Sequence, residues 1–272
     1  MAVFEAIPWT FDVDSIHFWI HYGFVILGFV LAVVSMVVQC MKPAPYGRHQ
    51  QSHDSWGPMI NQRLGHIVSD FIPGVILFIL VYFLYGSEDA RFGYTNQTFL
   101  WLWLLHYIHR GIIHPLLMRY SQKEVSLGIT LGGLFPNLIF SFVCSDWIGS
   151  AVYADNYFYD PRFILGIILF VVGYIINKWA DAKLRRLRNQ GDNQGYHIPY
   201  GGLFEVISCP NYFGEMLEWT GWALGTWSLA GCVWLLFGCS TFIPRSKHNH
   251  TWYKEHFEDY PNRRKALIPF VY

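Results

Sequence analysis

Two stripes of polar side chains lie on segments that are otherwise apolar. The first is spaced at i, i+4, i+8 and i+11 and consists of Asn177, Asp181, Arg185 and Arg188. The second is spaced at i, i+4 and i+7 and consists of Asn211, Glu215 and Glu218. Such spacings put each set on one helix face. Carboxylates accept hydrogen bonds from ribose hydroxyls and arginine binds phosphate bidentately, so the stripes favour a ribose–phosphate ligand. An interhelical ion-pair network is an equal alternative, because intramembrane charges commonly pair.

A second kind of chemistry is indicated around Tyr107, which lies inside another apolar run. Tyr107 and Arg110 are three residues apart and share a helix face. A buried tyrosine beside an acid can donate a proton to a carbonyl oxygen. Asp70, near the start of a further apolar run, is the candidate acid. The structural alternatives are an aromatic core residue for Tyr107 and a helix-capping or interfacial carboxylate for Asp70.

Composition shows which elements must position these groups. The 272 residues are 53% hydrophobic and only 14% charged, whereas soluble domains carry about 25% charged residues. The formal net charge is zero, so no basic field for nucleic acid is present. We therefore predict an all-α integral membrane protein.

Motifs for metal, disulfide and common nucleotide folds are missing from the sequence. The five cysteines include no C-x-x-C pair and indicate neither a disulfide framework nor a zinc site. His106, His109 and His114 lack the repeated acid-and-histidine clusters of a di-metal site, so we predict no metal. Neither G-x-G-x-x-G nor G-x-x-x-x-G-K-[ST] occurs, which excludes a Rossmann or P-loop nucleotide site.

Apolar runs and charge distribution predict the membrane topology. The runs cover residues 16–39, 67–85, 98–118, 126–143, 162–180 and 219–243. Segments 40–66, 119–125, 178–200 and 244–272 hold 16 of the 19 lysines and arginines, whereas the acids of segment 144–161 gather with the opposite loops. By the positive-inside rule the basic segments are cytosolic.

Because 178–200 and the C-terminus then lie on the same side, two crossings must fit within 203–243. This gives a bundle of about seven transmembrane helices with the N-terminus outside and the C-terminus cytosolic. The sixth helix is expected near 203–222. Segments 181–200 and 244–272 are expected to form a cytosolic cap of loops.

Several motifs lie beside the polar residues. They are KP-x-x-YGRH at 42–49, HY-x-HR at 106–110, N-x-x-x-D-x-x-LR-x-LR at 177–188, YHIPYGGLF at 196–204, SCPNY-x-GE at 208–215 and WYK-x-x-FEDYP-x-x-RKALIPF at 252–270. Together they closely resemble the steroid 5α-reductase family, from about residue 42 to the end of the chain. That family reduces an electron-poor carbon–carbon double bond with NADPH, typically the Δ4 bond of a 3-oxo-steroid. Its members are seven-helix membrane enzymes.

The resemblance implies a role for individual residues. Tyr107 matches the tyrosine that hydrogen-bonds the 3-keto oxygen, and Asp70 is the best match for the glutamate that accompanies it. Aspartate is one methylene shorter, so a longer or water-bridged ketone contact is expected. The family's NADPH contacts are matched by Tyr46, Arg119, Asn177, Asp181, Arg188, His197, Asn211, Glu215, Arg245, His250, Tyr253 and Arg264. His197 stands in place of an arginine, which predicts a weaker grip on the 2′-phosphate, and His248 is the alternative to His250.

The resemblance further implies one reductase domain over residues 1–272, with helices of 1–145 on the substrate side and 146–272 holding NADPH. Hydride would reach the β carbon of the enone while Tyr107 and Asp70 polarise the ketone. Polyprenol reductases and very-long-chain enoyl thioester reductases share this fold and remain alternatives. An isoprenylcysteine methyltransferase-like enzyme or a transporter is more remote. The expected partners are a lipid enone and membrane lipid, without nucleic acid or an obligate protein partner. The expected membrane is the endoplasmic reticulum in a eukaryote or the inner membrane in a bacterium.

Overall fold

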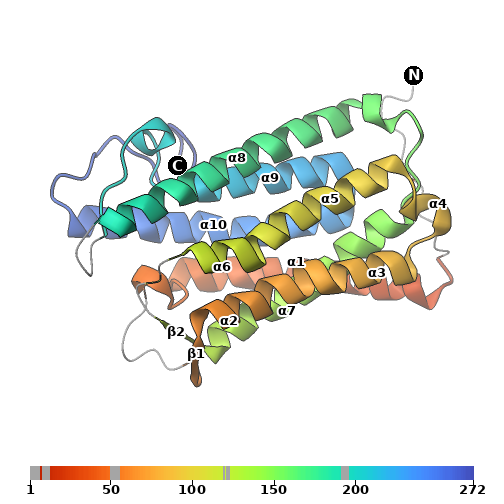
Figure 1. The fold of residues 1–272 in the computed structure, drawn as a ribbon, viewed down its shortest axis with the longest axis horizontal. Coiled ribbons are helices and arrows are strands. Elements are labelled where there is room, and N and C mark those ends of the chain that lie inside the picture. Colours follow the sequence, from red (N-terminus) through yellow and green to blue (C-terminus); the bar gives the residue numbers. More distant parts are fainter. Residues whose placement is uncertain (1–6, 8–12, 50–55, 119, 121–122, 191–195) are drawn as a thin grey trace.

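The computed structural model describes residues 7, 13–49, 56–118, 120, 123–190 and 196–272. Long helices that lie side by side make up most of it (Figure 1). Within these ranges, five helices are long and apolar enough to cross a membrane. They are α1 (Ile16–Met41), the continuous stretch of α2 (Gln62–His66), η2 (Ile67–Leu77) and α3 (Phe78–Tyr85), α7 (Leu127–Ser150), α8 (Pro161–Gln190) and α10 (Leu229–His256). The prediction of an all-α membrane protein is confirmed.

Local sequence signals explain where the first helix begins and ends. The Ser15 hydroxyl oxygen accepts the N–H of Phe18 at 3.2 Å, which is an N-cap. Lys42 is extended, with φ −143° and ψ 130°, because the residue before a proline avoids the α region. The helix therefore continues through Met41, two residues beyond the predicted apolar run.

Two further helical stretches lie in the same bundle. One consists of α5 (Tyr94–Ile108), η3 (His109–Ile113) and α6 (His114–Leu117), and the other is α9 (Pro210–Thr226), which packs along α8 and α10. The 17 residues of α9 span about 26 Å, close to the shortest length that crosses a bilayer. The count of about seven crossings stays a prediction. The short elements are η1 (Gly47–His49), α4 (Glu88–Arg91), η4 (Tyr157–Tyr159), η5 (Gly202–Glu205) and the antiparallel strands β1 (Met59–Asn61) and β2 (Glu124–Ser126).

The apolar run 219–243 is divided between two helices. Trp227 adopts a left-handed conformation with φ 48°, and Ser228 caps α10 by accepting the Gly231 N–H at 2.9 Å. The predicted sixth helix near 203–222 is therefore displaced to 210–226. Hydrophobicity alone does not detect a turn whose flanks are both apolar.

Two further boundaries differ from the prediction for the same reason. The basic segments 181–200 and 244–272 are helical up to Gln190 and His256, so the loops at this end are shorter than expected. At the other end α7 continues to Ser150, which places Asp146 inside a helix with no exposed surface. Its carboxylate contacts the rings of His17 at 2.7 Å and His21 at 2.6 Å, tying α7 to α1.

Glycines bring α8 and α9 into close contact. A Cβ on Gly173 would collide with the backbone of Glu218, and a Cβ on Gly221 would collide with the backbone of Gly166 and Phe170. Small residues allow such close helix packing in membranes. The predicted packing role of Gly221 agrees with this contact, which fixes the polar face of α9 against α8.

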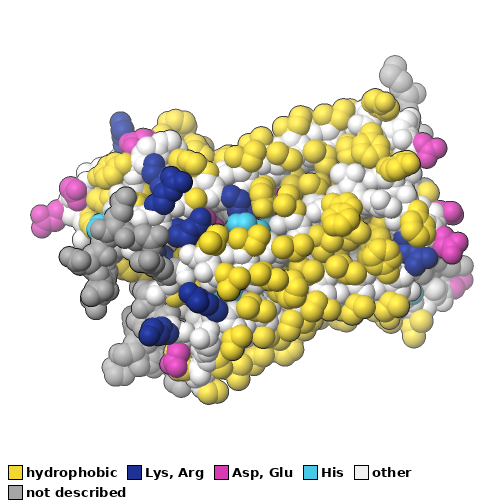
Figure 2. Space-filling view, viewed as in Figure 1, with side chains coloured by type: hydrophobic (Ala, Val, Ile, Leu, Met, Phe, Trp, Pro, Cys, Tyr) yellow, Lys and Arg dark blue, Asp and Glu magenta, His cyan; other side chains and the backbone are white. Residues whose placement is uncertain are grey.

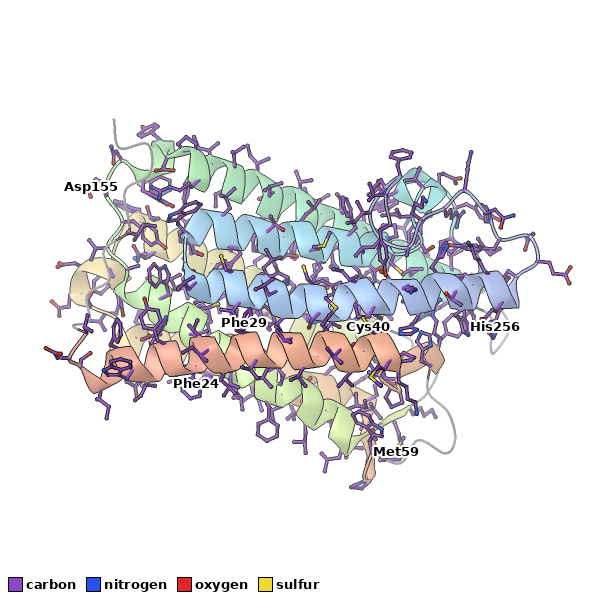
Figure 3. The ribbon with its side chains drawn as sticks, turned by 180° about the vertical axis from the view of Figure 1, so that it is seen from behind. Phe24, Phe29, Cys40, Met59, Asp155 and His256 are labelled. Atoms are coloured by element: carbon purple, nitrogen blue, oxygen red, sulfur yellow. The ribbon has the colours of Figure 1, made fainter. Side chains whose placement is uncertain are left out.

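Charge and apolar surface are separated along the bundle. On the face shown in Figure 2, apolar side chains cover the middle and most Lys and Arg gather at the end that carries the C-terminus. Seen from behind, α1 runs beside α10, with Cys40 and His256 toward that end and Asp155 at the opposite one (Figure 3). This distribution is the one expected for a cytosolic C-terminal end, and the orientation in the membrane stays a prediction.

Candidate active site

Tyr107 lies in a closed aromatic core. Only 2% of its surface is exposed, and its ring stacks on Trp103 with centroids 4.9 Å apart. Trp103 in turn stacks on Phe78 at 4.4 Å and contacts Trp219 at 5.5 Å. Flat rings from α3, α5 and α9 therefore surround the tyrosine and keep water away from its hydroxyl.

Asp70 reaches the same place from η2, but it does not contact Tyr107 directly. The Tyr107 hydroxyl donates to Asn137 Oδ1 at 3.2 Å, and Asn137 Nδ2 approaches Asp70 Oδ1 at 3.4 Å. The Asp70 carboxylate also accepts from the Ser69 hydroxyl at 3.0 Å and from Arg110 Nε at 3.3 Å. The structure thus brings the predicted pair into one site, with an amide between them. Asp70 is 6% exposed, which does not fit the interfacial alternative.

Further carboxylates continue this network into α9. Arg110 Nη1 lies 3.5 Å from Glu215 Oε1, and His106 Nδ1 donates to Glu218 Oε1 at 2.7 Å. Glu215 and Glu218 are 5% and 0% exposed, whereas the Arg110 side chain is 43% exposed. We call Asp70, His106, Arg110, Glu215 and Glu218 the paired cluster. The second polar stripe is therefore part of an interhelical charge network, and its partners come from α5 and η3.

The first polar stripe meets the paired cluster at one end. Asn177 donates to the Asn211 backbone carbonyl at 2.9 Å and lies 3.4 Å from Glu215 Oε2. One turn further along α8, Asp181 lies 3.6 Å from His114 Nδ1. Among the described residues no group of three His, Cys, Asp or Glu side chains could hold a metal ion.

Three arginines at the C-terminal end of the bundle lie against tyrosine and tryptophan rings. Arg48 lies 4.9 Å from the centre of the Tyr196 ring and 4.5 Å from that of Tyr253, and Arg188 lies 5.7 Å from Tyr196. Tyr253 stacks on Tyr260 at 5.2 Å. The remaining contacts are those of Arg264 with Tyr200 at 4.9 Å and Tyr260 at 5.2 Å, and of Arg48 with Trp252 at 4.8 Å. We call Arg48, Arg188, Arg264 and these five rings the arginine–aromatic layer.

The arginines of this layer lack acidic partners. Within the described ranges none of the three lies in an ion pair, and Nε, Nη1 and Nη2 of Arg264 have no acceptor although the residue is only 1% exposed. Arg48 Nη1 is likewise buried without an acceptor. A buried donor left unpaired costs about 1–3 kcal/mol. The layer therefore suits an anion, and a small cavity beside it is lined by Arg48, Leu184, Leu187, Arg188, Tyr196, His197 and Tyr253.

The segment before η1 is held against α10. Arg245 donates to the backbone carbonyls of Ala44 at 2.7 Å and Tyr46 at 2.9 Å, and its guanidinium lies 3.6 Å from the centre of the Tyr46 ring. His49 Nε2 lies 3.0 Å from Asn249 Oδ1. Burial, together with nearby Arg245, lowers the pKa of His49 to about 4. These contacts hold Arg48 in the layer, so Arg245 supports the site through its backbone contacts.

Ser208 organises the other side of the layer. Its hydroxyl lies 2.6 Å from both His250 Nδ1 and the Tyr260 hydroxyl. Burial raises the pKa of the neighbouring Cys209 thiol to about 11, so this thiol stays protonated. His197 is exposed at the edge of the cavity, and Arg119 lies outside the described residues.

Sequence reasoning missed Asn137 and Arg48. Asn137 is the only amide or ionisable residue in the run 126–143, which was the available signal. Arg48 stands in the motif at 42–49 but received no role. Their partners are 30 to 205 residues away in the sequence, so helix spacing does not reveal them.

Comparison with known proteins agrees with this geometry. Residues 123–272 match the family model described as 3-oxo-5-alpha-steroid 4-dehydrogenase. The chain is 38% identical over 250 residues to Steroid 5-alpha-reductase DET2 of Solanum lycopersicum, covering 89% of this chain and 93% of that protein. It is 39% identical over 244 residues to 3-oxo-5-alpha-steroid 4-dehydrogenase 1 of Rattus norvegicus, covering 89% and 91%. The corresponding human protein is 35% identical over 254 residues, with 89% and 94% covered.

The chain belongs to the steroid 5α-reductase family. Members of this family are oxidoreductases that act on CH–CH groups, and this protein is an enzyme of that class. The matched region contains α7 to α10, which contribute Asn137, both glutamates of the paired cluster and two arginines of the layer. Tyr107 and Asp70 lie before it, within the helices that the full-length relatives also cover.

Proposed function

We propose that this protein reduces the Δ4 double bond of a 3-oxo-steroid to the 5α-reduced product, with NADPH as the electron donor. The observation that carries the proposal is the buried Tyr107 hydroxyl, held within one amide of Asp70 in a chain of the steroid 5α-reductase family. Such a group suits a substrate whose double bond is conjugated to a carbonyl. The relatives' names supply the substrate class.

The aromatic core suits a flat ring system with a ketone at one end. Rings of Trp103, Trp219 and Trp234 lie within 5.2 to 6.1 Å of one another around Tyr107. Tyr107 donates its O–H to the ketone oxygen, and Asp70 with Arg110 fixes the electrostatic environment. As the β carbon gains hydride, negative charge develops on that oxygen. A preorganised donor in a dry site stabilises this enolate far more than water does. A proton at the α carbon completes the reduction.

The arginine–aromatic layer suits the phosphates of a dinucleotide. Arg48, Arg188 and Arg264 offer donors that have no protein carboxylate to bind, and arginine pairs bidentately with phosphate. When bound, NADPH supplies the hydride. Asn177, Asp181 and Arg188 continue along one face of α8 from Glu215 toward the layer, over about 16 Å at 1.5 Å per residue. This polar face leads from the phosphates to the neighbourhood of Tyr107.

A reduction assay tests the proposal. Purified protein in detergent would be supplied with NADPH and progesterone or testosterone, and the product followed by mass spectrometry. We expect a gain of two hydrogens at the Δ4 bond. Tyr107→Phe should abolish it, whereas Tyr82→Phe should not, because the equally buried Tyr82 hydroxyl donates to the Arg91 carbonyl instead.

The other outcomes decide between reaction classes. Tight NADPH binding without steroid product would contradict the substrate and favour polyprenol or enoyl thioester reduction. No NADPH binding would contradict the reductase proposal as a whole. Methyl transfer from S-adenosylmethionine to an isoprenylcysteine would then identify the methyltransferase alternative.

A further inference from the structure

One amide side chain in α7 connects three groups of the site. Asn137 Nδ2 donates to the Ser69 backbone carbonyl at 2.8 Å and approaches Asp70 Oδ1 at 3.4 Å, while Asn137 Oδ1 accepts from the Tyr107 hydroxyl at 3.2 Å. The residue is 9% exposed and its neighbours along α7 are apolar. Its polar atoms are therefore all committed to η2 and α5.

The orientation of this amide is fixed by its partners. A backbone carbonyl can only accept, so the Asn137 NH₂ group must face Ser69. The oxygen then faces Tyr107, and the tyrosine must be the donor in their hydrogen bond. In this structure the Tyr107 proton points at Asn137, on the side of Asp70. A ketone that enters the site has to compete with this acceptor.

Other buried polar residues that tie helices to α7 differ from Asn137. Ser145 donates to the Phe78 carbonyl at 2.6 Å, and Asn96 donates to the carbonyls of Ile148 and Ala151 at 2.6 and 2.8 Å. Both contact backbone only, as a helix-packing role requires. Asn137 makes one such contact and adds two side chains that belong to the paired cluster or act with it.

We propose that Asn137 is a positioning residue, which sets the separation and orientation of the Tyr107 hydroxyl and the Asp70 carboxylate and holds the tyrosine proton until a ketone takes its place. The proposal rests on the proposed function, because it assigns Tyr107 as the donor to the ketone. It explains how a short aspartate acts with Tyr107 without touching it. It also excludes direct proton exchange between these two groups in the ligand-free site, since a carboxamide separates them.

Asn137→Leu and Ser145→Ala form the matched pair of variants. Leucine keeps the size of asparagine and removes both polar atoms, whereas Ser145→Ala removes one buried hydrogen bond from the same helix without touching the site. For Asn137→Leu we expect kcat to fall about 10²-fold, as a donor misplaced by about 1 Å does. The Kd for NADPH should stay within twofold. Ser145→Ala should keep kcat within twofold even if its melting temperature falls equally.

A binding measurement keeps the test independent of turnover. Because Trp103 stacks on Tyr107, tryptophan fluorescence should report a steroid in the site. The wild type should bind a 3-oxo-steroid more tightly than its 3-deoxy analogue. Asn137→Leu should bind both with similar affinity, since the tyrosine no longer points to one place. This result separates failure of the positioning role from failure of the proposed reaction.

Asn137→Asp provides a second readout and a second variant should leucine not fold. It keeps an acceptor for Tyr107 but places an ionisable group next to Asp70. The pH profile of kcat, or of ketone binding, should then gain a new inflection that the wild type lacks. The proposal is overturned if Asn137→Leu keeps kcat and the ketone preference of the wild type. It is equally overturned if Asn137→Asp folds and shows an unchanged pH profile.

Discussion

The paired cluster and the arginine–aromatic layer both place charges where water is scarce, but they neutralise them differently. In the paired cluster each carboxylate lies next to a cation, an imidazole or an amide of another helix, as Glu218 does with His106 at 2.7 Å. In the layer, Arg264 has three buried donors and only aromatic rings beside them. The cluster is complete within the protein, whereas the layer is completed by an anion.

This difference separates two tasks of a reductase. A network whose partners are all protein groups can hold a catalytic donor in place before substrate arrives, because no ligand is needed to balance its charge. Arginines without acidic partners keep their binding capacity for a ligand. We therefore expect substitutions in the first region to change turnover or stability, and substitutions in the second to change cofactor affinity.

The largest expected effect is that of Tyr107→Phe on turnover. Loss of the only hydroxyl that faces the ketone should lower kcat about 10²–10³-fold, with the Kd for NADPH unchanged. Steady-state kinetics with a 3-oxo-steroid and NADPH titration measure the two quantities. Normal turnover in this variant would remove Tyr107 from the mechanism and the cluster from catalysis.

Arg264→Ala tests the layer. Removing charge-assisted hydrogen bonds to phosphate, about 1.5–3 kcal/mol, should weaken NADPH binding about 10–100-fold. The melting temperature without cofactor should hardly change, because the guanidinium has no protein acceptor to lose. Arg263→Ala is the matched control, since its side chain is 77% exposed and only reaches Glu205 at 3.4 Å. Equal NADPH affinity in both variants would contradict an anion site in the layer.

Glu218→Gln tests the opposite property of the paired cluster. Glutamine keeps the shape and an acceptor for His106 but makes the hydrogen bond neutral, which should lower the free energy of unfolding by about 1 kcal/mol. A melting temperature about 2–4 °C lower is expected for a chain of this size. Thermal unfolding in detergent, with and without NADPH, measures it. A large loss of NADPH affinity with unchanged stability would place Glu218 in the cofactor site instead.

The smallest expected effect concerns pH and the segment that carries Arg48. The pKa of His49 is lowered to about 4 by burial and by nearby Arg245 and Arg48, so the unfolded chain takes up a proton near pH 6.5 while the folded protein does not. Stability from this group is present above pH 6.5 and is lost as the pH falls toward 4. His49→Gln should show a smaller drop in melting temperature between pH 7.5 and 5 than the wild type. An identical drop would show that His49 does not titrate in this way.

The sequence predicted the cluster and the layer to different extents. His106-Tyr107 and the Asn211–Glu218 stripe were visible because catalytic and polar residue types stand out in apolar runs. That Glu218 pairs with His106 was not visible, because the two are 112 residues apart. Asp146 was misassigned to a loop for a related reason, since its imidazole partners lie on α1. Arg119 lies outside the described residues, so its predicted role is not compared.

The amino-acid sequence by itself determined the membrane class, most helix positions and the residue types at the site. These properties depend on neighbours along the chain, through hydrophobic length, helical spacing and charge at helix ends. Tertiary structure alone decided which polar groups meet. Asn137 enters between Tyr107 and Asp70, 30 and 67 residues away, because packing of α7 against η2 and α5 brings it there. Glycine contacts between α8 and α9 likewise decide where the glutamates lie, and such contacts depend on the shape of the whole bundle.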